Sequence, residues 1–205
     1  MEKDISLDLQ KEKSLLVIVD MVNGFVTSGA LADPSIQAIT PNILDLLNQF
    51  LHFNQPVLAF QDAHPEDALE FQSFPVHCVK GTEESELIKE LLPYKDKMTC
   101  LEKNSTNGFF AYGFMDYLLQ QGPFDSIVIT GCCTDICVLQ FALALKTHFN
   151  QNSISSTIIV PKDCVDTFHT ELHPKEDFNQ FSLQLMESSG IIVLEHLSVK
   201  EDSNE

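Results

Sequence analysis

Six short segments of this chain, most of them continuous apolar runs, are each followed by polar residues. They lie at residues 14–20, 56–61, 97–102, 126–130, 157–160 and 191–195. Short runs rich in apolar and β-branched residues are typical of strands that are covered on both faces, as in parallel sheets. We therefore expect six strands in one mostly parallel sheet.

Between these segments the apolar residues recur at helical spacing. Such stretches lie at 41–53, 83–92, 109–121, 135–145 and 174–189. Alternating strands and helices predict a three-layer α/β/α fold of Rossmann-like type, with a six-stranded, mostly parallel sheet and right-handed crossovers. No internal repeat and no linker interrupts the alternation. We expect a single domain over residues 1–205, with its core at about 14–195.

Composition and charge narrow the range of partners. The chain has 205 residues, of which 44% are hydrophobic and 20% charged, as is usual for a soluble globular domain. A formal net charge of -18 would repel nucleic acid and anionic membrane surfaces, so we expect neither as a partner. No apolar run reaches the ~20 residues of a membrane span, and residues 1–13 are polar, so we expect a cytoplasmic protein. The six cysteines form no framework, which favours reduced thiols.

The segment 126–145 reads as strand, tight turn and helix, with three cysteines in the turn. Cys137 falls in the first helical turn, with Thr134 or Asp135 available as the N-cap. The positive end of the helix dipole would lower the pKa of a thiol there and favour a nucleophilic thiolate. The alternative is that Cys132, Cys133 and Cys137 are small buried residues packing a helix on a sheet.

Ionisable residues also stand at the ends of other predicted strands, where open α/β sheets bind their ligands. Asp20 ends the first strand and Lys103 ends the third; each could instead be a loop cap or a surface charge. The second strand leads into a cluster whose side chains supply only nitrogen and oxygen donors, which suit zinc, manganese or iron, although loop histidines are often merely solvated. Its members are Asp62, His64, Glu70 and His77.

Three motifs follow one another along the chain: LLVIVDMVNGF with Asp20, LEK with Lys103 and TGCCTDICV with Cys137. In this order they resemble those of the isochorismatase-like cysteine hydrolases, and within that family the chain looks most like the nicotinamidases. QDAHP and FPVHCVKGT match the segments in which nicotinamidases place metal ligands. Two positions depart from the pattern: Phe74 stands where tryptophan is common, and Ile136 stands where histidine is frequent.

The resemblance implies a triad in which Cys137 attacks an amide carbonyl, Asp20 accepts the thiol proton and Lys103 holds the carboxylate. It also implies a cis peptide bond between Cys132 and Cys133, with the N–H groups of Cys133 and Cys137 facing the oxyanion. The reaction would convert nicotinamide and water to nicotinate and ammonia through a thioester.

The resemblance further implies one divalent metal ion, zinc first and manganese or iron next, that binds the pyridine nitrogen and positions water. Its ligands would be Asp62, His64, Glu70 and His77. The aromatic ring would lie among Phe25, Phe74 and Phe110. Two alternatives stay open: a metal-free amidase of the same family acting on ureido or carbamoyl compounds, and a catalytically silent binding homologue. Assembly into a homo-oligomer also stays open.

Overall fold

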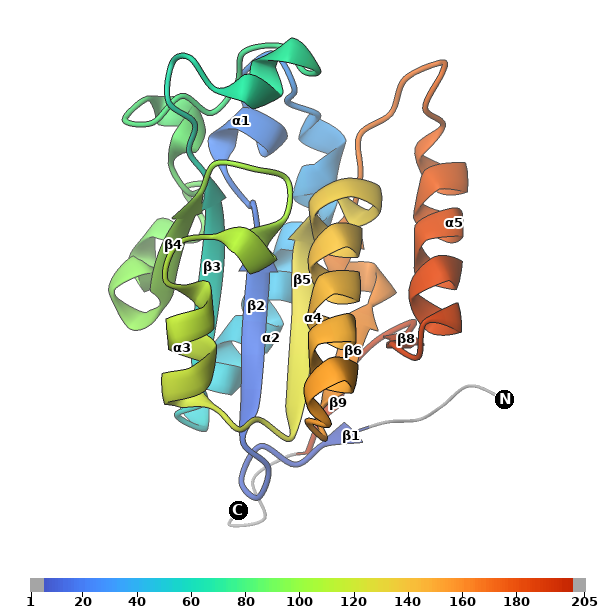
Figure 1. The fold of residues 1–205 in the computed structure, drawn as a ribbon. Coiled ribbons are helices and arrows are strands. Elements are labelled where there is room, and N and C mark those ends of the chain that lie inside the picture. The colour runs from blue at the N-terminus through green and yellow to red at the C-terminus, as the bar shows by residue number, and fades with distance from the viewer. Residues whose placement is uncertain (1–5, 201–205) are drawn as a thin grey trace.

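A computed structural model of the chain describes residues 6–200 (Figure 1). Its core is a seven-stranded sheet in the order β4-β3-β2-β5-β6-β8, with β7 paired to the end of β5. All of its pairings are parallel. The strands are β2 (Ser14–Val19), β3 (Val57–Asp62), β4 (Thr99–Lys103), β5 (Ser126–Cys132), β6 (Thr157–Pro161), β7 (Val165–Asp166) and β8 (Ile192–Leu194).

The six predicted strands are present, and the additional strand β7 is only two residues long. A separate two-stranded sheet joins β1 (Ser6–Leu7) to β9 (Ser198–Val199). The mostly parallel α/β architecture is therefore confirmed, with one more strand in the main sheet than expected.

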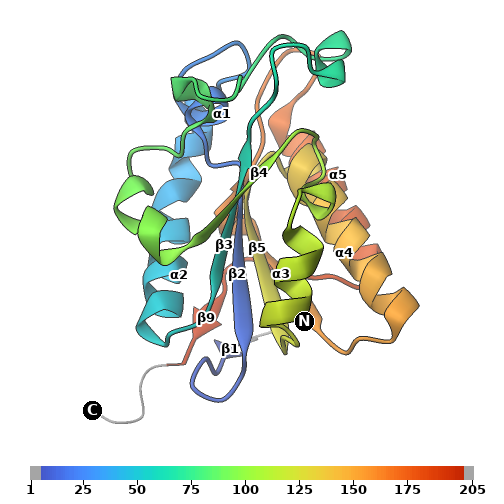
Figure 2. The ribbon, with the colours of Figure 1, turned by 60° about the vertical axis from the view of Figure 1, so that its left-hand side comes forward.

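Helices cover both faces of the sheet, as Figure 2 shows. One face carries α1 (Asn23–Val26) and α2 (Thr40–His52); the other carries α3 (Phe114–Gln121), α4 (Leu139–Asn152) and α5 (Lys175–Ser188). Side chains that alternate along a strand serve the two faces in turn. In β2, Leu16 and Ile18 join the core under α2, while Val17 and Val19 join the core under α3 and α4. This arrangement explains why β2 is apolar at every position.

Short 3₁₀ segments fill several connections, at Pro34–Ile39, Leu69–Gln72, Glu83–Ser85, Leu92–Lys97, Gly108–Phe110 and Lys162–Cys164. Within residues 6–200, no helix is both long and apolar enough to cross a membrane.

The helix predicted over 83–92 does not form beyond the turn Glu83–Ser85. The backbone that follows pairs with the segment after β2 instead. Asn23 N–H donates to the Glu86 carbonyl at 2.9 Å, and Ile88 N–H donates to the Met21 carbonyl at 3.0 Å. Tertiary hydrogen bonds thus replace the local helical ones, so the prediction was wrong here.

The predicted helix over 109–121 begins only at Phe114. Gly113, with φ of 85°, separates α3 from the 3₁₀ turn Gly108–Phe110. Phe114 is fully buried, whereas Phe110 is 75% exposed. The helical period therefore identifies the core stripe of α3 but not its start.

Candidate active site

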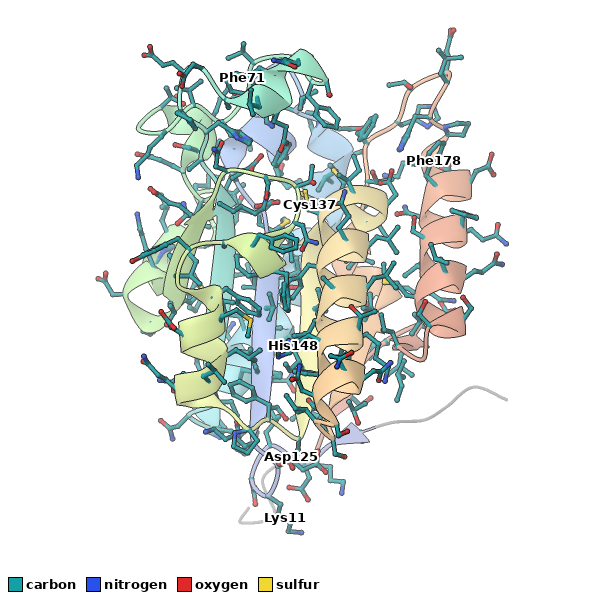
Figure 3. The ribbon with its side chains drawn as sticks, in the orientation of Figure 1. Lys11, Phe71, Asp125, Cys137, His148 and Phe178 are labelled. Atoms are coloured by element: carbon teal, nitrogen blue, oxygen red, sulfur yellow. The ribbon has the colours of Figure 1, made fainter. Side chains whose placement is uncertain are left out.

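The chain changes direction across the sheet between β2 and β5. From β2 it proceeds to β3 and β4 on one side, and then returns to β5, β6 and β8 on the other. Open α/β sheets bind ligands outside the carboxyl ends of strands at such a switch point. Figure 3 shows Cys137 at this end of the molecule, where α4 begins.

Three predicted residues meet at this point. Lys103 Nζ lies 2.8 Å from Asp20 Oδ2 and 3.9 Å from Cys137 Sγ. Asp20 and Lys103 are buried, and Cys137 is 5% exposed. The ammonium group therefore lies next to both the carboxylate and the thiol, and Asp20 also interacts with the Cys137 thiol through a hydrogen bond. A proton can pass from sulfur to Asp20 beside a fixed positive charge.

The charges of this group are strongly perturbed. Burial raises the pKa of Asp20 to about 7, against the opposing effect of the Lys103 ammonium. Burial also disfavours the charged form of Lys103, but the two neighbouring carboxylates, Asp20 and Asp62, together with Cys137 hold its pKa well above the usual value. Asp20 can therefore gain and lose a proton near neutral pH, while Lys103 remains an ammonium ion.

The resting thiol of Cys137 is protonated. Burial raises its pKa well above the usual value, and Lys103 compensates only in part. The prediction that the helix start lowers this pKa was wrong, because it left out the cost of charging a buried sulfur. Neither proposed N-cap side chain caps this helix, which starts as a π-helical turn, Thr134–Val138. Deprotonation of Cys137 therefore requires an adjacent base.

The turn before Cys137 brings β5 very close to β2. Gly131 has φ of 106°, and a Cβ there would lie 2.0 Å from the Val19 carbonyl oxygen, so only glycine fits. The peptide bond between Cys132 and Cys133 is cis. Cys132 Sγ donates to the Asp20 carbonyl at 3.2 Å. The cysteine turn is thus joined directly to the backbone of Asp20.

Four side chains at the end of β3 and in the following loop gather into one cluster. The cluster consists of Asp62, His64, Glu70 and His77. The atoms that these side chains could offer to a metal ion all lie within 4.8 Å of one another. Asp62 Oδ2 is 2.9 Å from His64 Nε2 and 3.2 Å from His77 Nε2, and Glu70 Oε1 is 3.8 Å from His64 Nε2. Donors of a tetrahedral zinc site with bonds of about 2.0–2.1 Å are about 3.3 Å apart, so these separations fit such an ion.

The far sides of both imidazole rings are already bonded. His77 Nδ1 lies 2.7 Å from the Pro75 carbonyl oxygen, and His64 Nδ1 lies 2.8 Å from Asn104 Oδ1. A carbonyl can only accept, so His77 carries a proton on Nδ1, and its Nε2 faces Asp62. A hydrogen-bond partner on the second ring nitrogen is the usual support of a metal-bound histidine.

Asp62 connects the two groups through its two oxygens. Oδ2 faces the histidines, while Oδ1 accepts a hydrogen bond from Lys103 Nζ at 2.8 Å. Burial alone would raise the pKa of Asp62, but the Lys103 ammonium and the histidine contacts hold it far below its usual range. Asp62 is therefore an anion that contacts both the histidines of the cluster and Lys103 of the triad.

A cavity of about 420 Å³ opens over Cys137 and the cluster. Phe25, Phe74, Cys133, Glu70 and His77 line it, but Phe110 does not. Phe110 lies on the exposed surface, so the expectation that it contacts a bound ring is wrong.

A further aromatic wall of the cavity, Phe168, follows β7 and escaped the sequence analysis. The two-residue strand before it is too short to leave an apolar run, so only its aromatic character could have drawn attention to it.

Comparison with known proteins gives a consistent result. The family model described as the isochorismatase domain matches residues 14–196. Nicotinamidase 1 of Arabidopsis thaliana is 34% identical over 195 residues, which cover 86% of this chain and 79% of that protein. The crystal structure of a nicotinamidase from Bacillus subtilis superposes with a TM-score of 0.75 at 25% identity, over 89% of this chain and 99% of that one.

The crystal structure of N-carbamoylsarcosine amidase from Thermoplasma acidophilum has a TM-score of 0.71 at 27% identity, over 94% of this chain and 98% of that one. The family match spans every strand and helix that contributes to the cavity. This chain therefore belongs to the isochorismatase family.

Proposed function

We propose that this chain is a metal-dependent nicotinamidase, an amidohydrolase that converts nicotinamide and water to nicotinate and ammonia through a thioester on Cys137. One observation carries the proposal: Cys137 of the buried triad lines the same cavity as three members of the cluster, Asp62, Glu70 and His77. The likeness to Arabidopsis nicotinamidase supports the choice of substrate.

The triad supplies the covalent chemistry. Asp20 accepts the Cys137 proton, and Sγ attacks the amide carbon, with the negative charge forming on the carbonyl oxygen. The N–H groups of Cys133 and Cys137 stabilise that oxyanion; loss of one such donor typically costs about 10²–10³ in rate. Asp20 then gives the proton to the leaving nitrogen, the C–N bond breaks and ammonia departs. Water, with Asp20 as base, cleaves the thioester and regenerates the thiol.

The cluster would hold one divalent ion through Asp62, His64, Glu70 and His77, with zinc favoured by the mixed imidazole and carboxylate donors. Such an ion supplies a Lewis acid for the ring nitrogen of the substrate. Phe25 and Phe74 line the cavity beside it and would contact the ring faces.

A second candidate is a metal-free amidase that acts on ureido or carbamoyl compounds. The likeness to N-carbamoylsarcosine amidase favours it. The two candidates differ in what they require of His64 and His77, because a linear carbamoyl compound has no ring nitrogen to bind.

The test combines metal analysis with an ammonia-release assay on protein purified without chelator. We expect about one zinc, manganese or iron ion per chain and ammonia release from nicotinamide. The reaction should be lost after chelation and in His64→Ala, while iodoacetamide still alkylates Cys137 in both samples. Full activity after exhaustive chelation, or ammonia release from N-carbamoylsarcosine but not from nicotinamide, would transfer the assignment to the metal-free amidase.

A further inference from the structure

The segment between β7 and α5 contains a histidine that is stacked between two phenylalanines. The His173 ring lies 3.9 Å from the Phe168 ring with an interplanar angle of 10°, and 3.7 Å from the Phe178 ring with an angle of 25°. Phe178 lies near the start of α5, at the same end of the molecule as Cys137 (Figure 3). The three rings form a column that ends on the cavity, since Phe168 is part of its lining.

The middle ring of this column, His173, is hydrogen-bonded to the turn that carries Cys137. His173 Nε2 lies 2.8 Å from Asp135 Oδ2, and Nδ1 lies 3.0 Å from the Phe168 carbonyl oxygen. Asp135 stands two positions before Cys137 and also accepts a hydrogen bond from Thr167 Oγ1 at 2.5 Å. The ring is therefore fixed in its plane as well as on both faces.

Hydrogen bonds to Asp33 and Ser35 also hold this segment. His169 N–H donates to Asp33 Oδ2 at 2.9 Å, and Asp33 itself lines the cavity. Lys175 Nζ, at the start of α5, contacts Asp166 Oδ2 at 2.6 Å and Ser35 Oγ at 3.1 Å. These contacts keep Phe168 in place, although its neighbours His169 and Thr170 are exposed.

We propose that Phe168 is a substrate-contacting wall that favours planar aromatic carboxamides, and that His173 is the positioning residue that holds this wall through the Phe168–His173–Phe178 column. The inference rests on the proposed function, because it concerns the ring of that substrate. The cavity already has aromatic residues on its lining in Phe25 and Phe74. Phe168 adds a third aromatic side chain, from an element far along the chain.

The wall affects binding of the ring and not the chemistry at the amide. An aromatic contact changes affinity by about 2- to 10-fold beyond its buried area. Phe168→Ala and His173→Ala should therefore raise KM for nicotinamide by about that factor and leave kcat within about twofold. Nicotinamide should bind the Cys137→Ala protein with a dissociation constant that rises by the same factor when His173→Ala is added.

Two conservative variants separate stacking from hydrogen bonding. His173→Phe keeps an aromatic ring in the column without its polar contacts and should stay near the wild-type KM. His173→Asn retains a polar side chain but removes the ring, and should resemble His173→Ala. His196→Ala is the matched control, because His196 pairs with Asp163 at 2.7 Å outside the cavity and should change neither constant.

Each variant is first compared with wild type by thermal unfolding, which shows whether it is folded. The rate of iodoacetamide alkylation of Cys137 is then measured and should equal that of wild type. A normal KM in the folded Phe168→Ala or His173→Ala protein would overturn this inference alone. Rescue by asparagine instead of phenylalanine, or a fall in kcat and alkylation at constant KM, would also overturn it, since His173 would then act on the nucleophile turn. A wild-type chain that does not hydrolyse nicotinamide would overturn the proposed function as well.

Discussion

Replacing Lys103 with methionine tests how the buried charges stabilise each other. Lys103 Nζ is 2.8 Å from Asp20 Oδ2 and 2.8 Å from Asp62 Oδ1, and all three side chains are at most 2% exposed. Methionine fills a similar volume without the ammonium group. Two buried carboxylates then lose their common cation, and removing one partner of a buried ion pair costs about 3–5 kcal/mol. We expect that loss in the free energy of unfolding at pH 7, measured by urea denaturation of chelated protein.

A matched control and the pH dependence make this prediction specific. Lys162→Met removes the same group from its ion pair with Glu195, but the two side chains are 39% and 69% exposed, so the cost should be about 0–1 kcal/mol. In wild type, Lys103 lowers the pKa values of Asp20 and Asp62 against the effect of burial. Both values rise in Lys103→Met, so the folded variant takes up protons first and its deficit should shrink as pH falls. Equal costs for the two variants, or a deficit that grows in acid, would refute this reasoning.

Three further predictions concern activity and metal binding. The value of kcat/KM should increase about tenfold per pH unit up to about pH 7, because Asp20 must lose its proton to act as base, and Asp20→Asn should lower kcat by about 10²–10⁴; a flat pH profile would contradict this. Cys137→Ala should abolish ammonia release while Cys100→Ala, in β4 outside the cavity, retains it; residual turnover in the first would exclude Cys137 as nucleophile. Asn104→Ala should weaken metal binding about tenfold in a chelator competition, because it removes the hydrogen-bond partner of His64 Nδ1. The effect should be at the lower end of the usual range, since Asn104 is exposed and water can replace its side chain. Unchanged affinity would mean that Asn104 does not support His64.

The strands of the main sheet could be predicted where a local run of apolar residues marks them, because the tertiary structure keeps those runs in strands. Strand β2 is apolar at every position because it is covered twice, and its run is visible in the sequence. The segment after Glu83 shows the opposite case, since its helical spacing was real but its backbone bonds to residues 21–23. Nothing within 83–92 reveals that distant partner.

The candidate site was predictable where its residues belong to motifs and not elsewhere. The four side chains proposed as metal ligands, Asp62, His64, Glu70 and His77, lie close together. The pKa of Cys137 was misjudged, because burial depends on packing that a local motif does not display. Phe168 has no periodic neighbours and only becomes part of the cavity because the segment after β7 folds back over it.

The position of the site at four strand ends has a kinetic consequence. Asp20 and Cys132 are in contact although they are 112 positions apart in the chain. Strands β3 and β4, which lie between them in the sequence, supply Asp62 and Lys103. Contacts of such long sequence separation form late in folding, because much of the chain must already be ordered to bring them together. After dilution from urea, recovery of hydrolysis should therefore lag behind recovery of helical circular dichroism. The enzyme's own turnover would then report the completion of its sheet.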